Sequence, residues 1–203
     1  MVIYSKLKDI HFFGGRLSLD FINTVHDRTE EPVRDYLHNI LDVIEWARMR
    51  KVITVPQSRE LASYSLQNLE KGNRCYLKAM ELREFLYTIF SKVSAGEELH
   101  QDDLARLTKD TRNALSFIHL TSSAGMVSEV FCFPKNNYDA VLAPVIRDAH
   151  VLLLQNLQHR IRSCPSCGWL FLDTTRNGKR RWCSMKMCGS NAKALDWYHR
   201  HKK

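Results

Sequence analysis

The chain has 203 residues, of which 44% are hydrophobic and 26% are charged, and its formal net charge is +8. This length suits one ordinary domain with a small additional module, and the composition is that of a soluble globular protein. No apolar run reaches the roughly 18 residues of a transmembrane helix, and the first ten residues lack the features of a secretory signal, so we expect a cytoplasmic protein without membrane contact.

The first 115 residues are predicted to be helical. Apolar residues recur at helical spacing in five segments, the first beginning at about Ser18 and the others spanning residues 35–51, 57–70, 74–93 and 104–115. Gly72 and Gly96 are expected to end the third and fourth of these helices, because glycine commonly terminates helices.

The pattern then changes to alternation. Residues 115–121 and 127–133 are rich in β-branched and aromatic side chains and flank a Ser-Ser-Ala-Gly turn, which predicts one β-hairpin. An apolar helix is expected from Asp139 to Arg162, leading directly into a cysteine-containing module. We therefore predict a mainly α fold with a helical domain over residues 1–158 and a small module over residues 159–203.

Four cysteines define that module. Cys164-Pro-Ser-Cys167 is separated by fifteen residues from Cys183-Ser-Met-Lys-Met-Cys188. Two close pairs at this separation are typical of a tetrahedral zinc site, so we expect one structural Zn²⁺ held by four thiolates. Two disulfides or four unrelated core cysteines are the weaker alternative, since disulfides are rare in a reducing compartment. Cys75 and Cys132 stand in apolar segments and are expected to be buried.

The module is predicted to be a treble-clef-like finger. Residues 164–168 have the form of a zinc knuckle, and Asn177-Gly178 is a strong hairpin-turn signal between two short predicted strands at 169–172 and 180–183. Ser190 is expected to cap a final helix. Because so short a segment has little core, zinc would supply much of its folding free energy.

The excess positive charge is concentrated in this module. Residues 159–203 contain eleven Lys and Arg but only two acids, a net charge of +9, whereas the first 158 residues carry 19 basic and 20 acidic side chains. A basic metal-binding module on a neutral body favours a nucleic-acid partner, because contacts with phosphates release counterions. The alternative is that these basic residues form a solvated surface without a binding partner. The candidate nucleic-acid-binding residues are Arg176, Lys179, Arg180, Arg181, Lys186, Lys193 and Arg200.

At these residues the chain resembles the CGNR zinc-finger family of bacterial proteins. The resemblance rests on the stretch from Cys164 to Gly189 and on Leu19-Asp-Phe-Ile-Asn-Thr24. In that family the finger follows a helical domain called ABATE, described as a "Putative stress-induced transcription regulator". Where the family name gives Cys-Gly-Asn-Arg, this chain has Cys188-Gly-Ser-Asn191, which keeps the metal ligand but lacks the arginine.

The resemblance implies a transcription regulator whose N-terminal domain is a candidate ligand sensor. Asp20, Asn23, Thr24 and Arg83 are candidates for a polar ligand pocket. The simpler alternative is that Asp20 and Asn23 tie helix ends by side-chain hydrogen bonds.

The leading hypothesis is a zinc-dependent DNA-binding regulator whose body senses a small molecule or forms a homodimer. A protein-interaction adaptor whose basic finger docks an acidic partner is the alternative. RNA is a further alternative to DNA, although no RRM-type signature is present. An enzyme is not expected, because four cysteines fill the zinc coordination sphere and the nine histidines show no His-Glu-x-x-His spacing.

Overall fold

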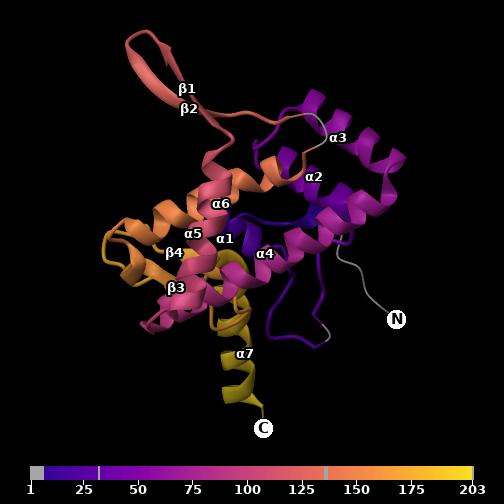
Figure 1. Cartoon of the computed structure of the whole chain (residues 1–203). Helices are drawn as coiled ribbons and strands as arrows, with labels where there is room; N and C mark the ends of the chain where they lie inside the picture. Colours follow the sequence, from indigo (N-terminus) through magenta and orange to yellow (C-terminus); the bar gives the residue numbers. More distant parts are fainter. Residues whose placement is uncertain (1–6, 32, 135–136, 203) are drawn as a thin grey trace.

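The computed structural model describes residues 7–31, 33–134 and 137–202. A helical body carries a projecting β-hairpin and ends in a projecting helix (Figure 1). This architecture confirms the predicted fold class. In chain order the elements are η1 (Leu7–Asp9), α1 (Leu17–Ile22), α2 (Ile40–Met49), α3 (Val55–Gln67), α4 (Leu69–Ala95), α5 (Gln101–Leu115), β1 (Ile118–Ser123), β2 (Met126–Phe131), α6 (Asp139–Leu154), η2 (Gln158–Arg160), β3 (Ile161–Ser163), β4 (Leu170–Leu172), η3 (Met185–Gly189) and α7 (Ser190–His201).

Side-chain caps set the starts of α2 and α3. The side chain of Asn39 accepts hydrogen bonds from two backbone N–H groups of the first turn, so α2 begins at Ile40, five residues later than predicted. Thr54 and Gln57 form a capping box at the start of α3, and proline lies in its first turn. Because of these caps, both helices begin at residues other than those predicted from apolar spacing.

Gly72 does not end a helix, so that prediction is wrong. The break falls at Asn68, and Gly72 lies inside α4. A Cβ at this position would lie 3.1 Å from Cγ2 of Ile40, so the glycine allows α4 to approach α2 closely. Gly96 does end α4, with a φ of 75°, as predicted.

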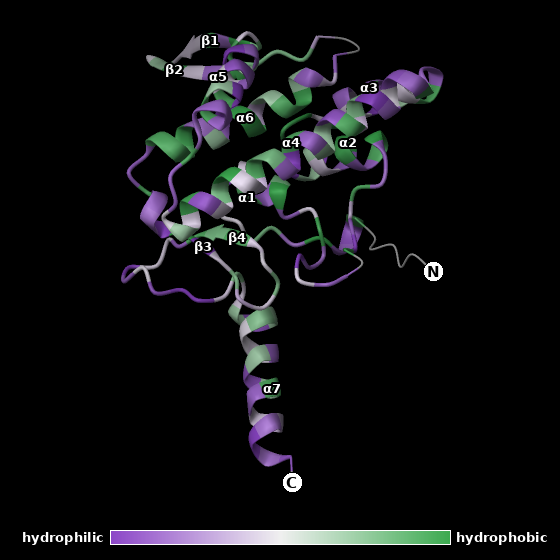
Figure 2. Cartoon of the chain, turned by 60° about the horizontal axis from the view of Figure 1, so that its bottom comes forward, coloured by the Kyte–Doolittle hydropathy of each residue, from purple (hydrophilic) through white to green (hydrophobic). Residues whose placement is uncertain are grey.

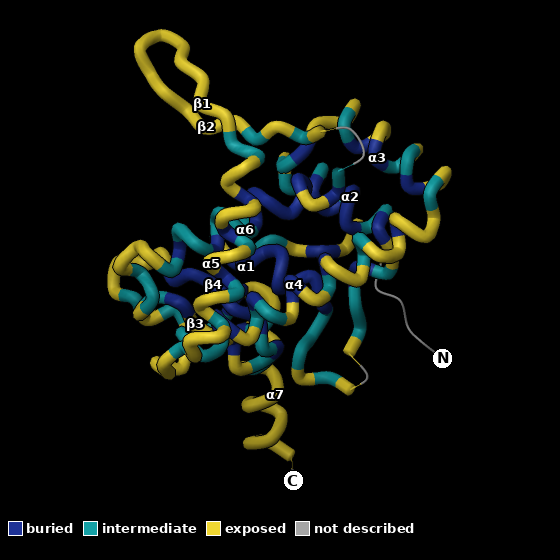
Figure 3. Tube along the Cα trace, in the orientation of Figure 1, coloured by how far each residue is buried: buried dark blue, intermediate teal, exposed yellow. Residues whose placement is uncertain are grey.

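The predicted hairpin is formed by β1 and β2. The strands pair antiparallel, and Ala124 and Gly125 in the turn both have positive φ, as a tight two-residue hairpin turn requires. The hairpin stands away from the body and is almost wholly exposed (Figure 3). Cys132 follows β2 and is exposed as well, so its predicted burial is wrong, because the hairpin does not enter the core. Cys75 is half-buried against the core.

Helix α6 ends at Leu154, eight residues before its predicted end. The chain then turns through η2 and forms β3, so the predicted continuous helix into Cys164 is wrong. Ile161 is buried and faces Leu172 across the β3–β4 pair, which explains why the chain leaves the helix. Pro144 lies in the second turn of α6.

One hydrophobic core joins the helical body to the cysteine module. Phe21, Trp46 and Phe90 from the body and Leu170 and Phe171 from the module are all less than 2% exposed and belong to one cluster. Helix α7 projects from the body, and both hydrophobic and hydrophilic residues occur along it (Figure 2). Among the helices of the described residues, none has the length and apolarity needed to span a membrane.

Candidate metal centre and nucleic-acid interface

The four predicted metal ligands lie together. The Sγ atoms of Cys164, Cys167, Cys183 and Cys188 are all within 4.8 Å of one another. Sγ of Cys183 lies 3.6 Å from that of Cys167 and 3.5 Å from that of Cys188. Four thiolates around zinc at about 2.3 Å would be separated by roughly 3.8 Å. The cluster therefore fits one structural zinc ion, as expected.

The close sulfur atoms shift one another's pKa values. Hydrogen bonds between the crowded sulfurs hold the pKa of Cys164 below its ordinary value and those of Cys167 and Cys183 above theirs. A coordinated metal deprotonates its thiols, so the cysteines would bind zinc as thiolates.

The first cysteine pair forms the predicted knuckle. Gly168 has a φ of 68°, and its N–H donates to the carbonyl oxygen of Cys164 at 2.9 Å. The N–H of Cys164 donates to the carbonyl oxygen of Trp169 at 2.8 Å, which closes the turn between β3 and β4. Glycine is needed here because other residues rarely adopt this φ.

The predicted pairing of residues 169–172 with 180–183 is wrong. Strand β4 pairs instead with β3, and residues 173–180 form a loop around the buried carboxylate of Asp173. That carboxylate accepts hydrogen bonds from the N–H and hydroxyl of Thr175, at 2.9 and 2.6 Å, and from the N–H of Arg180 at 2.7 Å. Burial would raise the pKa of Asp173, but these hydrogen bonds outweigh it and hold the pKa below its usual value. The loop uses the Asn177-Gly178 turn, but without a second strand.

The second cysteine pair leads into α7. The hydroxyl of Ser184 accepts from the N–H of Met187 at 3.3 Å and caps η3, which holds Cys188 and continues without interruption into α7. The predicted cap at Ser190 is wrong, because this residue is already helical and its hydroxyl donates to the carbonyl oxygen of Met185. The fourth metal ligand is thus built into the root of the projecting helix.

The predicted basic residues lie on one module but not at one point. A cavity of about 430 Å³ lies beside the finger, and no acidic residue lines it. Its lining consists of Ser163, Pro165, Gly178 and the four basic residues Arg162, Lys179, Arg180 and Arg181. Arg176 and Lys186 are exposed on the loop and on η3, and Lys193 and Arg200 are exposed on α7. Arg162, the last residue of a predicted helix, instead lies on β3 and joins this cavity, where it donates to the carbonyl oxygen of Gly178 at 3.1 Å.

Arg180 differs from the other basic residues. Its guanidinium lies 4.6 Å from the ring centroid of Phe171, and it donates to the carbonyl oxygens of Trp182 and Cys183. Its charged head is therefore engaged inside the finger.

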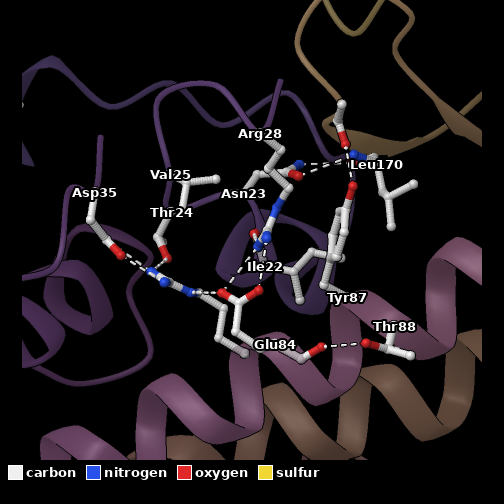
Figure 4. A network of polar contacts seen from close by, with 12 residues as sticks. Ile22, Asn23, Thr24, Val25, Arg28, Asp35, Glu84, Tyr87, Thr88 and Leu170 are labelled. Atoms are coloured by element: carbon white, nitrogen blue, oxygen red, sulfur yellow. Dashed lines mark hydrogen bonds and ion pairs between the residues drawn. The ribbon is translucent and has the colours of Figure 1, made fainter. Parts of the chain in front are cut away.

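The four candidate ligand residues make internal contacts. Asn23 donates to the carbonyl oxygen of Leu170 at 2.7 Å and accepts from the N–H of Leu170 at 3.1 Å (Figure 4). The structure brings Thr24 and Arg83 together at 3.2 Å, and Arg83 pairs with Asp35 at 2.6 Å. None of the four lines the cavities between α2 and α3, between α4, α5 and α6, or beside the finger.

Contacts that hold the zinc knuckle against the helical body were not predicted. The N–H of Arg28 donates to the carbonyl oxygen of Cys167 at 3.0 Å. The hydroxyl of Tyr87 donates to the carbonyl oxygen of Gly168 at 3.2 Å. The guanidinium of Arg28 lies 3.7 Å from the Tyr87 ring centroid and pairs with Glu84 at 2.8 Å (Figure 4). No periodicity or motif signals these long-range contacts.

Asp20 is expected to make the stability of the protein depend on pH. Its carboxylate accepts from the N–H of Gly14 and pairs with Arg50, both at 2.9 Å, but burial dominates and raises its pKa from 3.8 to about 6. Because this pKa is raised on folding, its stabilising effect is fully present below about pH 4 and is lost as the pH rises through about 6. A rise of this size corresponds to roughly 3 kcal/mol.

Urea unfolding of wild type and Asp20→Asn between pH 4 and 7 checks this. The stability of wild type relative to the variant should fall by roughly 2.5 kcal/mol across this range. The matched change at the exposed Asp196, Asp196→Asn, should show no such trend. A pH-independent difference at Asp20 would contradict the assignment.

Two family models match the chain. The model described as "CGNR zinc finger" matches residues 160–201, and the ABATE model, described as "Putative stress-induced transcription regulator", matches residues 15–156. A search of curated proteins finds no match.

Proposed function

This chain belongs to the ABATE family, whose description is "Putative stress-induced transcription regulator", and it ends in a CGNR zinc finger; on that basis we propose that it is a zinc-dependent, DNA-binding transcription regulator. The observation that carries the proposal is the acid-free basic cavity beside the zinc site. The residues that line it come from β3 and from the loop that precedes Cys183.

The cavity suits a phosphate group. Lys179 and Arg181 are exposed, and no carboxylate lines the space to neutralise them. The hydrogen bond from Arg162 to the carbonyl oxygen of Gly178 fixes its guanidinium at the wall. Arginine and lysine held in this way position a protein on the phosphate backbone without reading its sequence.

Helix α7 supplies the second part of the proposed interface. It has no buried residue and projects from the body (Figure 2). An α-helix with its side chains is about 10–12 Å wide, which matches the major groove of B-DNA. Asn191 lies in its first turn, with Lys193 and Arg200 further along. We therefore assign base contacts to α7 and phosphate contacts to the cavity residues.

Removing one cavity cation is expected to weaken DNA binding and its dependence on salt. Arg162→Ala and Lys179→Ala should each reduce the slope of log K against log salt by about 1, because one phosphate contact is lost. Zinc content should not change. Fluorescence anisotropy with random duplex DNA at several salt concentrations measures this slope, and Arg74→Ala on α4 is the control for loss of an exposed charge. An unchanged slope in both variants would remove the cavity from the interface.

A protein-interaction adaptor is the second candidate, and the exposed apolar residues of α7 favour it. Leu195 and Trp197 are 60% exposed and Tyr198 is 51% exposed. Aromatic residues such as Trp197 and Tyr198 are enriched in protein interfaces. If wild type fails to bind DNA even at low salt, and instead co-purifies with one acidic protein, the adaptor replaces the DNA-binding proposal.

A further inference from the structure

A cavity of about 750 Å³ lies between α4, α5 and α6, at the base of the β1–β2 hairpin. Ser116 and Phe117, which lead from α5 into β1, form part of its wall. The volume lies within the roughly 300–1,000 Å³ of small-molecule sites. The cavity is separate from the metal centre and from the basic cavity of the finger.

The floor of this cavity is apolar. Leu82 of α4, Ala114 of α5 and Leu142 of α6 line it, and each is buried, with 6%, 1% and 8% of its surface exposed. Each comes from a different helix, so the three helices meet below the cavity. A ligand that fills it would place an apolar group against this floor.

Most of the charges at the rim neutralise one another. Lys78 pairs with Asp139 at 3.6 Å, and Arg106 pairs with Glu81 at 2.9 Å. The guanidinium of Arg106 also lies 4.1 Å from the Phe85 ring centroid, which holds it at one side. These pairs leave little charge for a ligand.

Two adjacent residues of α5 lack a close ion pair. Within the described residues Lys109 has no ion pair, and it is exposed at the cavity. The Asp110 carboxylate pairs with Nε of Arg106 at 3.7 Å, a longer contact than the 2.9 Å between Arg106 and Glu81. Burial raises the pKa of Asp110, which agrees with an incompletely solvated carboxylate. One cation and one anion therefore face the cavity side by side above an apolar floor.

We propose that this cavity binds a zwitterionic small molecule with an apolar body, of the α-amino-acid type. The ligand carboxylate faces Lys109, its ammonium group faces Asp110, and its apolar side chain lies against Leu82, Ala114 and Leu142. Asn113, one turn further along α5, offers an amide to the same polar end.

The next part of α4 contacts the zinc finger. Lys78, Glu81 and Leu82 line the cavity, whereas Glu84 and Tyr87 hold Arg28 and the knuckle. A ligand between α4, α5 and α6 would stabilise one position of α4, and this position determines how the knuckle is held. The cavity is therefore placed to couple ligand binding to the finger; this regulatory role, unlike the binding itself, rests on the proposed function.

Isothermal titration of the zinc-loaded full chain tests the site without DNA. The probes are L-phenylalanine and L-leucine, with 3-phenylpropionate and phenethylamine as analogues that carry only one of the two charges. We expect at least one amino acid to bind at least tenfold more tightly than either analogue. Lys109→Ala should weaken the binding of that amino acid and of 3-phenylpropionate, but not the binding of phenethylamine. Asp110→Asn should weaken the binding of the amino acid and of phenethylamine, but not the binding of 3-phenylpropionate.

Arg112→Ala is the matched control, because Arg112 is exposed on α5 but does not line the cavity. The proposal is overturned if neither amino acid binds, if the analogues bind equally well, or if both cavity variants bind like wild type. DNA affinity is then measured with and without the amino acid. Binding with unchanged DNA affinity would remove the regulatory coupling and keep the site, whereas failure of wild type to bind DNA at all would count against the proposed function alone.

Discussion

Replacing Cys183 with serine is expected to abolish zinc binding and to destabilise the helical body together with the finger. Cys183 is 2% exposed, and its sulfur contacts those of both Cys167 and Cys188. Zinc contributes an apparent free energy of about 10–16 kcal/mol to isolated zinc fingers, which is as large as the roughly 5–15 kcal/mol stability of a typical domain. Because the body and finger share one core, the loss should reach α1 and α4.

Metal analysis and urea unfolding followed by far-ultraviolet circular dichroism check this result. Zinc per chain should fall from one to near zero, and the cooperative transition should move to much lower urea or disappear. Cys132→Ser is the matched control, because Cys132 is exposed and outside the metal site, and both quantities should stay at wild-type values. Loss of zinc with an unchanged urea midpoint would show that the body folds independently of the finger.

Asn23→Asp is expected to have the second largest effect, a loss of about 3–5 kcal/mol in the free energy of unfolding. The Asn23 amide, 1% exposed, forms a two-way hydrogen-bonded pair with the backbone of Leu170. Aspartate has the same shape but cannot donate to the Leu170 carbonyl oxygen while ionised. The variant therefore places a charge in the core and leaves that acceptor unpaired.

The matched control is Asn39→Asp. Asn39 is exposed and caps α2, and aspartate is an equally good cap, so its stability should change by less than about 0.5 kcal/mol. Both variants are compared by urea unfolding at pH 7. The amide pair is not important for folding if the two changes have equal effects.

The sequence predicts the fold class but not the elements that unite the fold. Apolar periodicity identifies the helices, because each buries one face against a common core. It misses β3, because a strand of three residues is too short to show an alternating pattern. The apolar residues near β3 also continue the helical spacing of α6. The sequence places the break between α3 and α4 at Gly72 instead of Asn68, because the two helices are joined by a single non-helical residue.

The metal site is more predictable than its surroundings. Ligand spacing is local, so the four cysteines can be found without knowing the fold. The contacts of Arg28 and Tyr87 with the knuckle join distant parts of the chain, and only the folded structure brings them together. Likewise, charge concentration selects the module but does not show that Arg180 turns inward or that Arg162 joins the basic cavity.

The pairing of the first and last thirds of the chain has a consequence for its synthesis. Asn23 and Leu170 are separated by 147 residues, and Val25 accepts a hydrogen bond from Trp169, 144 residues later. At translation rates of roughly 5–20 residues per second, about 7–30 s pass between the synthesis of α1 and the synthesis of the residues that it contacts in the finger. During this interval Leu19, Phe21 and Ile22 lack part of the core that buries them. Zinc uptake is therefore a late step in biogenesis, and a nascent chain that stops before residue 161 would expose an apolar surface to chaperones and proteases.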